Sequence, residues 1–272
     1  MLTRFEIDNF KSLVGFSLPL SRFNCVIGLN GSGKTTLLQA LDFAAHVMSG
    51  EVKEWLMARG WSAADLTSRL GKKSNIELAI ELVIEGHTFR WEATFNRTRL
   101  ACTREVAKCT EPLAVGNWKG DGSLRSDGAI YELKAGKYWH SSETTSPEQW
   151  NEIPFEYAGS LLSQLRVTQL SPLLRELRER IISICSLDLL SPEQLRRKTR
   201  MIDYANDIGS GGQQLGAFIH QLNLTERDQL LLSLQRYYPQ VTKIHTSILR
   251  GGAVKLELHE RYQINASGTD SL

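Results

Sequence analysis

Residues 28–35 restrict the fold of this chain more than any other segment, because they read Gly-Leu-Asn-Gly-Ser-Gly-Lys-Thr. The spacing matches G-x-x-x-x-G-K-[ST], the P-loop or Walker A motif, in which a glycine-rich turn joins a strand to a helix. The flanking residues agree with this. Residues 23–27 are rich in β-formers, and the apolar residues of 37–48 recur at spacings of three and four. We therefore predict a strand, a glycine loop and a helix, in that order.

The residue types of this loop suit the phosphates of ATP together with Mg²⁺. Glycines let the backbone fold tightly, so that its N–H groups point at phosphate oxygens, and the helix adds its positive N-terminal end. Lys34 is expected to reach the β- and γ-phosphates, and the Thr35 hydroxyl is expected to join the magnesium shell. The expected cofactors are therefore ATP and Mg²⁺.

Other interpretations of the motif have less support. A GTPase usually carries an Asn-Lys-x-Asp base-recognition motif, and the sequence contains none. A nucleoside or small-molecule kinase rarely has a long β-rich stretch so soon after the P-loop helix. Formation of a phosphorylated acceptor product would identify such a kinase. A glycine-rich loop with a solvated lysine is the purely structural alternative.

The rest of the chain changes character twice. A short helix over residues 52–57 precedes a β-rich stretch that extends to about residue 154. After Phe155 the sequence is leucine-rich and charged, which is typical of helices, and the last segment returns to a strand pattern. Strands are predicted over residues 2–10, 16–20, 76–84, 88–95, 101–107, 243–249 and 254–259. Helices are predicted over residues 160–170, 172–184 and 213–223, and two more are predicted to begin at residue 191 and after Thr225. Thr225 and Asp228 resemble a capping box for the last of these helices.

The composition of the chain says more about its cellular environment than about the reaction it performs. The chain has 272 residues, 42% of them hydrophobic, and its net charge of +2 does not by itself indicate a nucleic-acid partner. No apolar run approaches the ~18 residues of a membrane span, and residues 1–6 do not open a signal peptide. We expect a cytoplasmic protein with no membrane partner, no disulfide framework and no metal site built from cysteine or histidine. The spacing of its four cysteines, Cys25, Cys102, Cys109 and Cys185, and of its six histidines supports this expectation.

The start of the chain adds a specific resemblance. Residues 7–13 read Ile-Asp-Asn-Phe-Lys-Ser-Leu ahead of the P-loop, and residues 36–41 read Thr-Leu-Leu-Gln-Ala-Leu behind it. Residues 1 to about 45 thereby resemble the N-terminus of the RecF, SMC and OLD-type ATPases, the ABC-like heads that mostly act on nucleic acid. This resemblance implies an α/β fold, a P-loop NTPase of the ABC/RecF type with a β-rich lobe and a helical insertion.

The resemblance also implies roles for single residues. Lys11 would lie near the nucleotide and Asn30 near the γ-phosphate; a solvated lysine at a strand end is the alternative for Lys11. In this class a glutamine that senses magnesium follows the β-rich part, which makes Gln164 a candidate metal ligand beside Thr35. Gln169 is a second candidate, and a solvated helix residue is the alternative for both. The expected nucleotide-binding set is Lys11, Gly28, Asn30, Gly31, Ser32, Gly33, Lys34, Thr35 and Thr36.

One part of the family pattern is missing from the sequence. An ABC-type ATPase also needs an apolar strand that ends in Asp-Glu, whose Asp supports magnesium and whose Glu orients the attacking water. The nearest segment is 181–188, but Asp188 is followed by Leu189, and the run continues a charged helix. No catalytic residue is therefore assigned.

Two segments imitate the ABC signature. Residues 210–214 read Ser-Gly-Gly-Gln-Gln, but two strands follow them in place of the Asp-Glu strand, which favours a glycine turn before a helix. Residues 264–272 include Ser267 and lie where RecF- and OLD-like proteins carry their signature. Because the sequence stops where the next helix should start, we expect a truncated core or a fragment of a longer protein. A frayed polar terminus is the alternative.

These observations predict three parts. Residues 1–157 form an N-terminal ATPase lobe with the P-loop and the β-rich part, residues 158–240 a helical insertion, and residues 241–272 a return to the ATPase core. Two such heads would form a homodimer through ATP, with the P-loop of one facing Ser267 of the other. ATP-gated closure would serve a nucleic-acid task such as repair or defence against phage.

Two points about partners stay open. A basic cluster in the helical part would either meet DNA phosphates or form a solvated helix face; its members are Arg196, Arg197, Lys198 and Arg200. The alternative to an ATPase is a non-hydrolysing, ATP-binding switch or scaffold that regulates a partner protein such as a nuclease. The sequence does not distinguish DNA from RNA.

Overall fold

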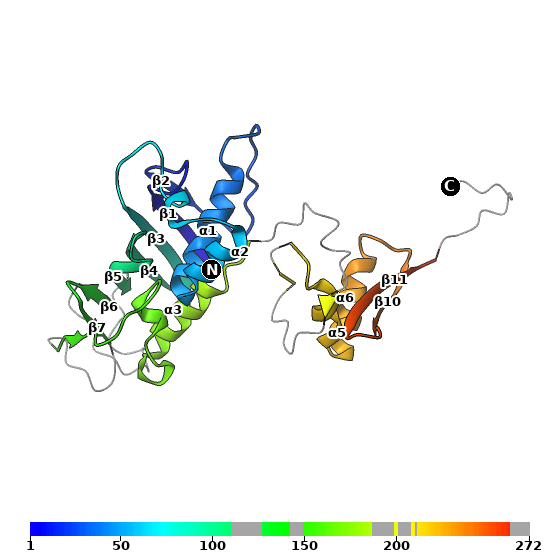
Figure 1. Cartoon of the computed structure of the whole chain (residues 1–272). Helices are drawn as coiled ribbons and strands as arrows, with labels where there is room; N and C mark the ends of the chain where they lie inside the picture. Colours follow the sequence, from blue (N-terminus) through cyan, green and yellow to red (C-terminus); the bar gives the residue numbers. More distant parts are fainter. Residues whose placement is uncertain (110–126, 142–148, 187–198, 201–207, 210, 262–272) are drawn as a thin grey trace. The chain divides into compact units, whose positions relative to one another are not determined.

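The computed structural model describes residues 1–109, 127–141, 149–186, 199–200, 208–209 and 211–261 (Figure 1). The chain divides into two compact units, residues 1–186 and residues 187–272. Within the described residues, no helix has both the length and the apolar character that crossing a membrane requires.

The first unit is built on an antiparallel sheet of eight strands, in the order β2-β1-β3-β4-β5-β6-β7-β8. In β4, buried Phe89, Trp91 and Phe95 alternate with partly exposed Arg90 and Glu92, so one face of the sheet is apolar and the other is charged. The strands are β1 Leu2–Asp8, β2 Phe16–Pro19, β3 Asn75–Ile84, β4 His87–Asn96, β5 Ala101–Cys109, β6 Ala129–Lys134, β7 Lys137–His140 and β8 Asn151–Glu152.

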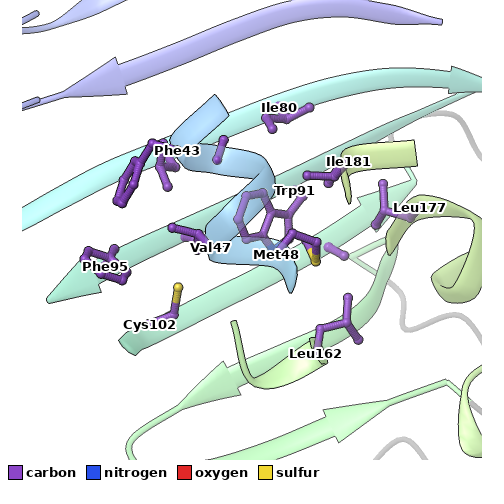
Figure 2. Packing of buried hydrophobic residues seen from close by; sticks show 14 of the residues in the cluster. Phe43, Val47, Met48, Ile80, Trp91, Phe95, Cys102, Leu162, Leu177 and Ile181 are labelled. Carbon is purple, nitrogen blue, oxygen red and sulfur yellow. The ribbon is translucent and has the colours of Figure 1, made fainter. Parts of the chain in front are cut away.

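Helices cover the apolar face of this sheet. The apolar side of α1 (Lys34–Ser49) and that of α3 (Pro172–Ile182) pack on the buried side chains of β3, β4 and β5 in one cluster (Figure 2). Its central members are Phe43, Val47, Met48, Ile80, Trp91, Phe95, Leu177 and Ile181. Each such side chain stabilises the fold by about 1.5–3 kcal/mol relative to exposure. Shorter helical elements complete the unit: α2 Val52–Arg59, and the 3₁₀ turns η1 Ala63–Asp65, η2 Leu161–Ser163 and η3 Val167–Gln169.

Most of the elements predicted for the first unit are confirmed. The helix after the P-loop is α1, the short helix after it is α2, and the leucine-rich helix that begins at Pro172 is α3. The predicted hairpin about Glu85-Gly86 is β3 and β4, whose ends Ile84 and His87 face each other across the turn. These elements show clear local periodicity, which is why the sequence reveals them.

The predicted strand over residues 23–27 is wrong for this chain. All residues from 21 to 32 are exposed; Phe23 and Ile27 keep 83% and 88% of their surface in contact with solvent. Among the described residues, no backbone hydrogen bond joins residues 22–27 to another strand. A strand needs a neighbour. β1 pairs with β2 on one side and β3 on the other, and no described backbone hydrogen bond joins this segment to the outer edge of β2.

The predicted helix over residues 160–170 is also wrong. Its place is taken by η2 and η3, two short 3₁₀ turns. The backbone N–H of Leu161 donates to the carboxylate of Glu105 on β5, at 2.7 Å, and Ser160 N–H donates to the carbonyl of Val47. These bonds tie the start of the segment to the sheet and to α1, so tertiary contacts prevail over helical propensity.

The second unit contains α5 (Leu215–Gln221), α6 (Leu224–Gln235) and a sheet in the order β10-β11-β9. Its strands are β9 Thr199–Arg200, β10 Val241–Ile248 and β11 Ala253–Glu260, which confirms the two strands predicted near the end of the chain. The capping box of α6 lies two residues earlier than predicted. It is formed by Asn223 and Glu226, because each side chain accepts a hydrogen bond from the other residue's backbone N–H.

The three-part division at residues 157 and 240 stays a prediction. Within the described residues, α3 packs on α1 in the first unit, whereas α5 and α6 pack on β10 and β11 in the second.

Glu105 is a fully buried carboxylate in the first unit. It accepts hydrogen bonds from Trp91 Nε1 (3.2 Å), Tyr131 OH (3.4 Å), Ser160 Oγ (2.5 Å) and the Leu161 N–H (2.7 Å). Burial raises the pKa of Glu105 to about 7, although these hydrogen bonds oppose the shift. The carboxyl group therefore joins β4, β5 and β6 to the start of η2 at a cost that depends on pH.

This cost leads to a prediction for Glu105→Gln. Between pH 4.5 and about 7 the folded protein holds a proton that the unfolded chain has released, so this group's contribution to the free energy of unfolding falls as pH rises. The wild type should lose about 3 kcal/mol relative to the variant over this range, and the difference should level off above it. Urea unfolding of both proteins from pH 4.5 to 8 measures the difference. A difference that does not change with pH would contradict the prediction.

Candidate functional site

The glycine loop connects the exposed segment 21–27 to the N-terminus of α1. Gly31 (φ 83°) and Gly33 (φ 91°) have left-handed backbone conformations, which residues with a Cβ adopt only with strain. Ser32 N–H donates to the Leu29 carbonyl at 3.2 Å and closes a turn within the loop. The backbone that the loop adopts therefore requires glycine at positions 31 and 33.

The N-terminus of α1 is open toward this loop. Gly33 is the N-cap and supplies no side-chain acceptor, and the first helical hydrogen bond runs from Leu37 N–H to the Gly33 carbonyl. The N–H groups of Lys34, Thr35 and Thr36 precede that bond and have no acceptor within the helix. Free amides and the positive end of a 16-residue helix together favour an anion at this position.

Lys34 bends back over its own loop. Its Nζ donates to the carbonyls of Gly28 (2.7 Å) and Leu29 (2.8 Å), and lies 3.5 Å from Ser32 Oγ. All three partners are neutral, so the ammonium keeps its charge available to an anion in the loop.

Lys11 lies beside the first two turns of α1. Its Nζ donates to Gln39 Oε1 at 3.0 Å and sits 3.1 Å from the centre of the Trp61 ring. Next to it, the Ser12 hydroxyl lies 3.4 Å from Thr36 Oγ1. The structure therefore brings the Lys11–Ser12 pair and the P-loop helix together, although β1 and α1 are separated by more than twenty residues.

The ammonium of Lys11 is partly removed from water. Burial is the main reason why the pKa of Lys11 falls to about 8, and the positive charge of Arg59 lowers it further, whereas Asp65 opposes the shift. Arg59 itself pairs with Asp42 at 2.6 Å. Lys11 therefore carries its charge at neutral pH and loses it in mildly alkaline solution.

Gln164 does not lie near Thr35, and its assignment as a magnesium ligand beside Thr35 is corrected. It sits at the C-terminal end of α1, where its side chain and that of Ser163 adjoin Gly50, the C-cap. Thr35 is at the opposite end of this 16-residue helix, roughly 20 Å away at 1.5 Å per residue. Gln169 is the exposed last residue of η3. Residues 160–163 are tied to β5 and α1, which fixes Gln164 at this end.

Several other candidates fall outside the described residues. They are Ser210 of the first signature-like segment, Asp188, Ser267 and the basic residues Arg196, Arg197 and Lys198. Gly211 to Gln214 form a turn before α5, and Gly211 N–H donates to the Gln213 side chain. Residues 181 and 182 end α3, so they are not part of a strand. No described strand ends in Asp-Glu, and no described cluster of three His, Cys, Asp or Glu residues has the spacing of a metal site.

Sequence reasoning missed Trp61, Gln39 and Arg59. Their contacts with Lys11 span up to 50 positions of the chain, so no local pattern reveals them. The one available signal was the position of Gln39, four residues after Thr35 and therefore on the same side of the P-loop helix.

A substitution at Gly33 tests the loop geometry. Gly33→Ala places a Cβ on a residue with φ 91°, which costs about 1–2 kcal/mol and should lower the midpoint of thermal unfolding by roughly 2–6 °C. Gly71→Ala is the matched control, because Gly71 does not have positive φ and a Cβ there meets nothing within 4 Å. Circular dichroism melts compare the two. Equal midpoints would mean that the loop relaxes without strain.

Comparison with known proteins supports the resemblance of the N-terminal region. Residues 1–90 match the family model described as "AAA ATPase domain". The OLD nuclease of Thermus scotoductus is 29% identical over 109 residues, which are 39% of this chain and 19% of that protein. Structural maintenance of chromosomes protein 1 of Schizosaccharomyces pombe is 41% identical over 66 residues, 22% of this chain and 5% of that protein.

The DNA replication and repair protein RecF of Actinobacillus pleuropneumoniae is 48% identical over 46 residues, 16% of this chain and 13% of that protein. The aligned part of the chain thus covers less than a fifth of each of these relatives. The N-terminal region of this chain is related to the P-loop ATPases of the OLD, SMC and RecF kind, as the residues around the P-loop indicated.

Proposed function

We propose that this chain is the ATP-binding part of an ABC-type ATPase head of the RecF, SMC or OLD kind. One observation carries the proposal: the N-terminus of α1 has no side-chain cap, and Lys34 and Lys11 lie beside it. It offers free amides and two cations to a polyphosphate, and neither cation is neutralised by a carboxylate among the described residues.

The residues of the loop have distinct roles in this proposal. Lys34 leaves the carbonyls of Gly28 and Leu29 and contacts the β- and γ-phosphates, while the amides of residues 31–36 bind phosphate oxygens. The hydroxyl of the exposed residue Thr35 holds Mg²⁺. Asn30 lies near the γ-phosphate, and the remaining loop residues Gly28, Gly31, Ser32, Gly33 and Thr36 shape the cradle.

We further propose that the ATPase core is incomplete in this chain. The exposed residues 23–27 support this, because Phe23, Val26 and Ile27 expose apolar side chains that a strand inside a sheet would bury. In the proposed head, further strands pair with this segment, and one of them ends in the Asp-Glu pair that hydrolysis needs. ATP then bridges two heads, with a serine such as Ser267 from the second head at the γ-phosphate.

The proposed setting is a cytoplasmic homodimer whose ATP-gated closure regulates repair of nucleic acid or defence against phage. The relatives named above support a nucleic-acid task, since they include a repair protein and a nuclease. A second candidate is a non-hydrolysing ATP-binding switch that regulates a partner such as a nuclease. It is favoured by the lack of an Asp-Glu strand among the described residues.

Replacement of Lys34 tests nucleotide binding. Lys34→Ala removes a charge-assisted contact to phosphate, and the affinity for MgATP should fall about 10- to 100-fold. Lys53→Ala on the exposed side of α2 is the control and should bind as the wild type does. Isothermal titration calorimetry measures both. If Lys34→Ala binds MgATP as tightly as the wild type, the proposed site is not the nucleotide site.

Phosphate release separates the ATPase from the switch. We expect residues 1–272 to bind MgATP without steady-state release of phosphate, because no described strand ends in the Asp-Glu pair whose Glu would orient the attacking water. A form that continues past Leu272 and supplies the Asp-Glu strand should release phosphate. Turnover by residues 1–272 alone would refute the incomplete core, and a longer form that binds but never hydrolyses would favour the switch.

A further inference from the structure

The position of the Trp61 ring is fixed by its surroundings. Gly60 ends α2 with φ 64°, and the N–H of Trp61 donates to the Leu56 carbonyl at 2.9 Å, which turns the chain back toward α2. The ring packs edge-on against Trp55, 5.4 Å between centroids at 89°, and remains half-buried. Trp55 is buried and donates from Nε1 to Asp42 on α1 at 2.6 Å. Trp61 is therefore anchored to α1 through Trp55.

Lys11 is held between this ring and α1. The Lys11 backbone adopts φ 48°, unusual for a residue with a side chain, and its N–H donates to the Leu66 carbonyl at 2.9 Å. Its ammonium lies on the face of the Trp61 ring and donates to Gln39 Oε1. Backbone and side chain are thus fixed at both ends, which limits the positions that the charge can take.

Both partners of the ammonium are neutral, and this is the informative feature. Asp42, the buried carboxylate nearby, is taken by Arg59 and by Trp55, each at 2.6 Å. Among the described residues, no ion pair joins Lys11 to a carboxylate. A cation over an aromatic face is stabilised without being neutralised. Lys11 therefore stays available for an anion.

We propose that Trp61 is a positioning residue that, with Gln39, holds the Lys11 ammonium beside the first turns of α1, where Lys11 contacts the phosphates of a bound nucleotide as a second cation besides Lys34. This inference rests on the proposed function, because it takes the P-loop as the nucleotide site. Ser12, the neighbour of Lys11, lies 3.4 Å from Thr36 and close to Gly33, which places the Lys11–Ser12 pair beside the N-terminal end of α1, where the proposed phosphates bind.

A pH profile gives a readout that a merely structural role of Trp61 would not move. The charged groups near Lys11 are Arg59 at the end of α2, Asp65 in η1 and, behind Arg59, Asp42 on α1. Because the pKa of Lys11 is about 8 before nucleotide binds, affinity for MgATP should fall up to about tenfold between pH 7 and pH 9. Removing the Trp61 ring exposes the Lys11 ammonium to water and raises its pKa, so the fall in affinity for MgATP should occur at higher pH.

A double-mutant cycle tests the inference with MgATP as the probe. At pH 7, Trp61→Leu should weaken binding about three- to tenfold, Trp61→Phe should keep most of the affinity, and Lys11→Ala should weaken binding at least as much. In the Lys11→Ala background, Trp61→Leu should cause no further loss, because the ring acts through Lys11. Phe155→Leu, an exposed aromatic residue elsewhere in the unit, is the control and should leave affinity unchanged.

The outcomes separate this inference from the proposed function. If Trp61→Leu retains wild-type affinity, or weakens binding equally with and without Lys11, the inference fails even when Lys34→Ala loses MgATP. If Lys34→Ala binds normally, the proposed function itself fails. Because Trp61 packs on Trp55, folding is checked by circular dichroism. Gln39→Leu supplies a second variant with little packing change, and it should weaken binding only when Lys11 is present.

Discussion

The packing of Phe43 on the sheet is the contact on which the rest of the first unit depends. Its ring stacks on Phe10 at 5.1 Å, meets Phe95 edge-on at 5.2 Å and lies 5.6 Å from Trp55. Phe10 follows β1, Phe95 belongs to β4 and Trp55 belongs to α2, so one side chain fixes α1 against three other parts of the unit. Figure 2 shows Phe43 and Phe95 in this core. Phe10 directly precedes Lys11 in the chain, and Trp55 packs against Trp61. The same cluster that holds α1 on the sheet therefore also sets the positions of the groups around its N-terminus.

Elements with a strong local pattern were predictable, whereas those decided by distant partners were not. The stripe of α1 and the alternation of β4 are visible in the sequence because burial follows the helix or strand period. Residues 23–27 have the composition of a strand but form none, since strand formation depends on a neighbour. Residues 160–170 have the composition of a helix, but the carboxylate of Glu105 and the carbonyl of Val47 bind the N–H groups that begin it.

The candidate site divides in the same way. The loop from Gly28 to Thr35 is a contiguous motif, so its residues and their chemistry could be predicted together. The position of Lys11 came from a resemblance, and only the fold shows that Gln39 and Trp61 hold it. Gln164 was assigned from its position in the chain, after the β-rich part, and this position did not determine where the residue lies in the fold. It lies at the wrong end of α1 for a ligand shared with Thr35.

The partners of each cation distinguish the site from the rest of the unit. On the charged face of the sheet, Arg90 pairs with Glu6, Glu81 and Glu92 at 2.6 to 2.8 Å, and these carboxylates neutralise it. Such a cation stabilises the fold but attracts no further anion.

Lys34 and Lys11 are instead held by carbonyls, an amide and an aromatic face, which orient them and leave their charge in place. Two oriented, un-neutralised ammonium groups at the open end of a helix create a positive potential at the loop. Holding the Lys11 ammonium partly out of water is unfavourable without an anion, because burial lowers its pKa and the positive charge of Arg59 lowers it further. The fold therefore maintains an arrangement that a polyphosphate would stabilise.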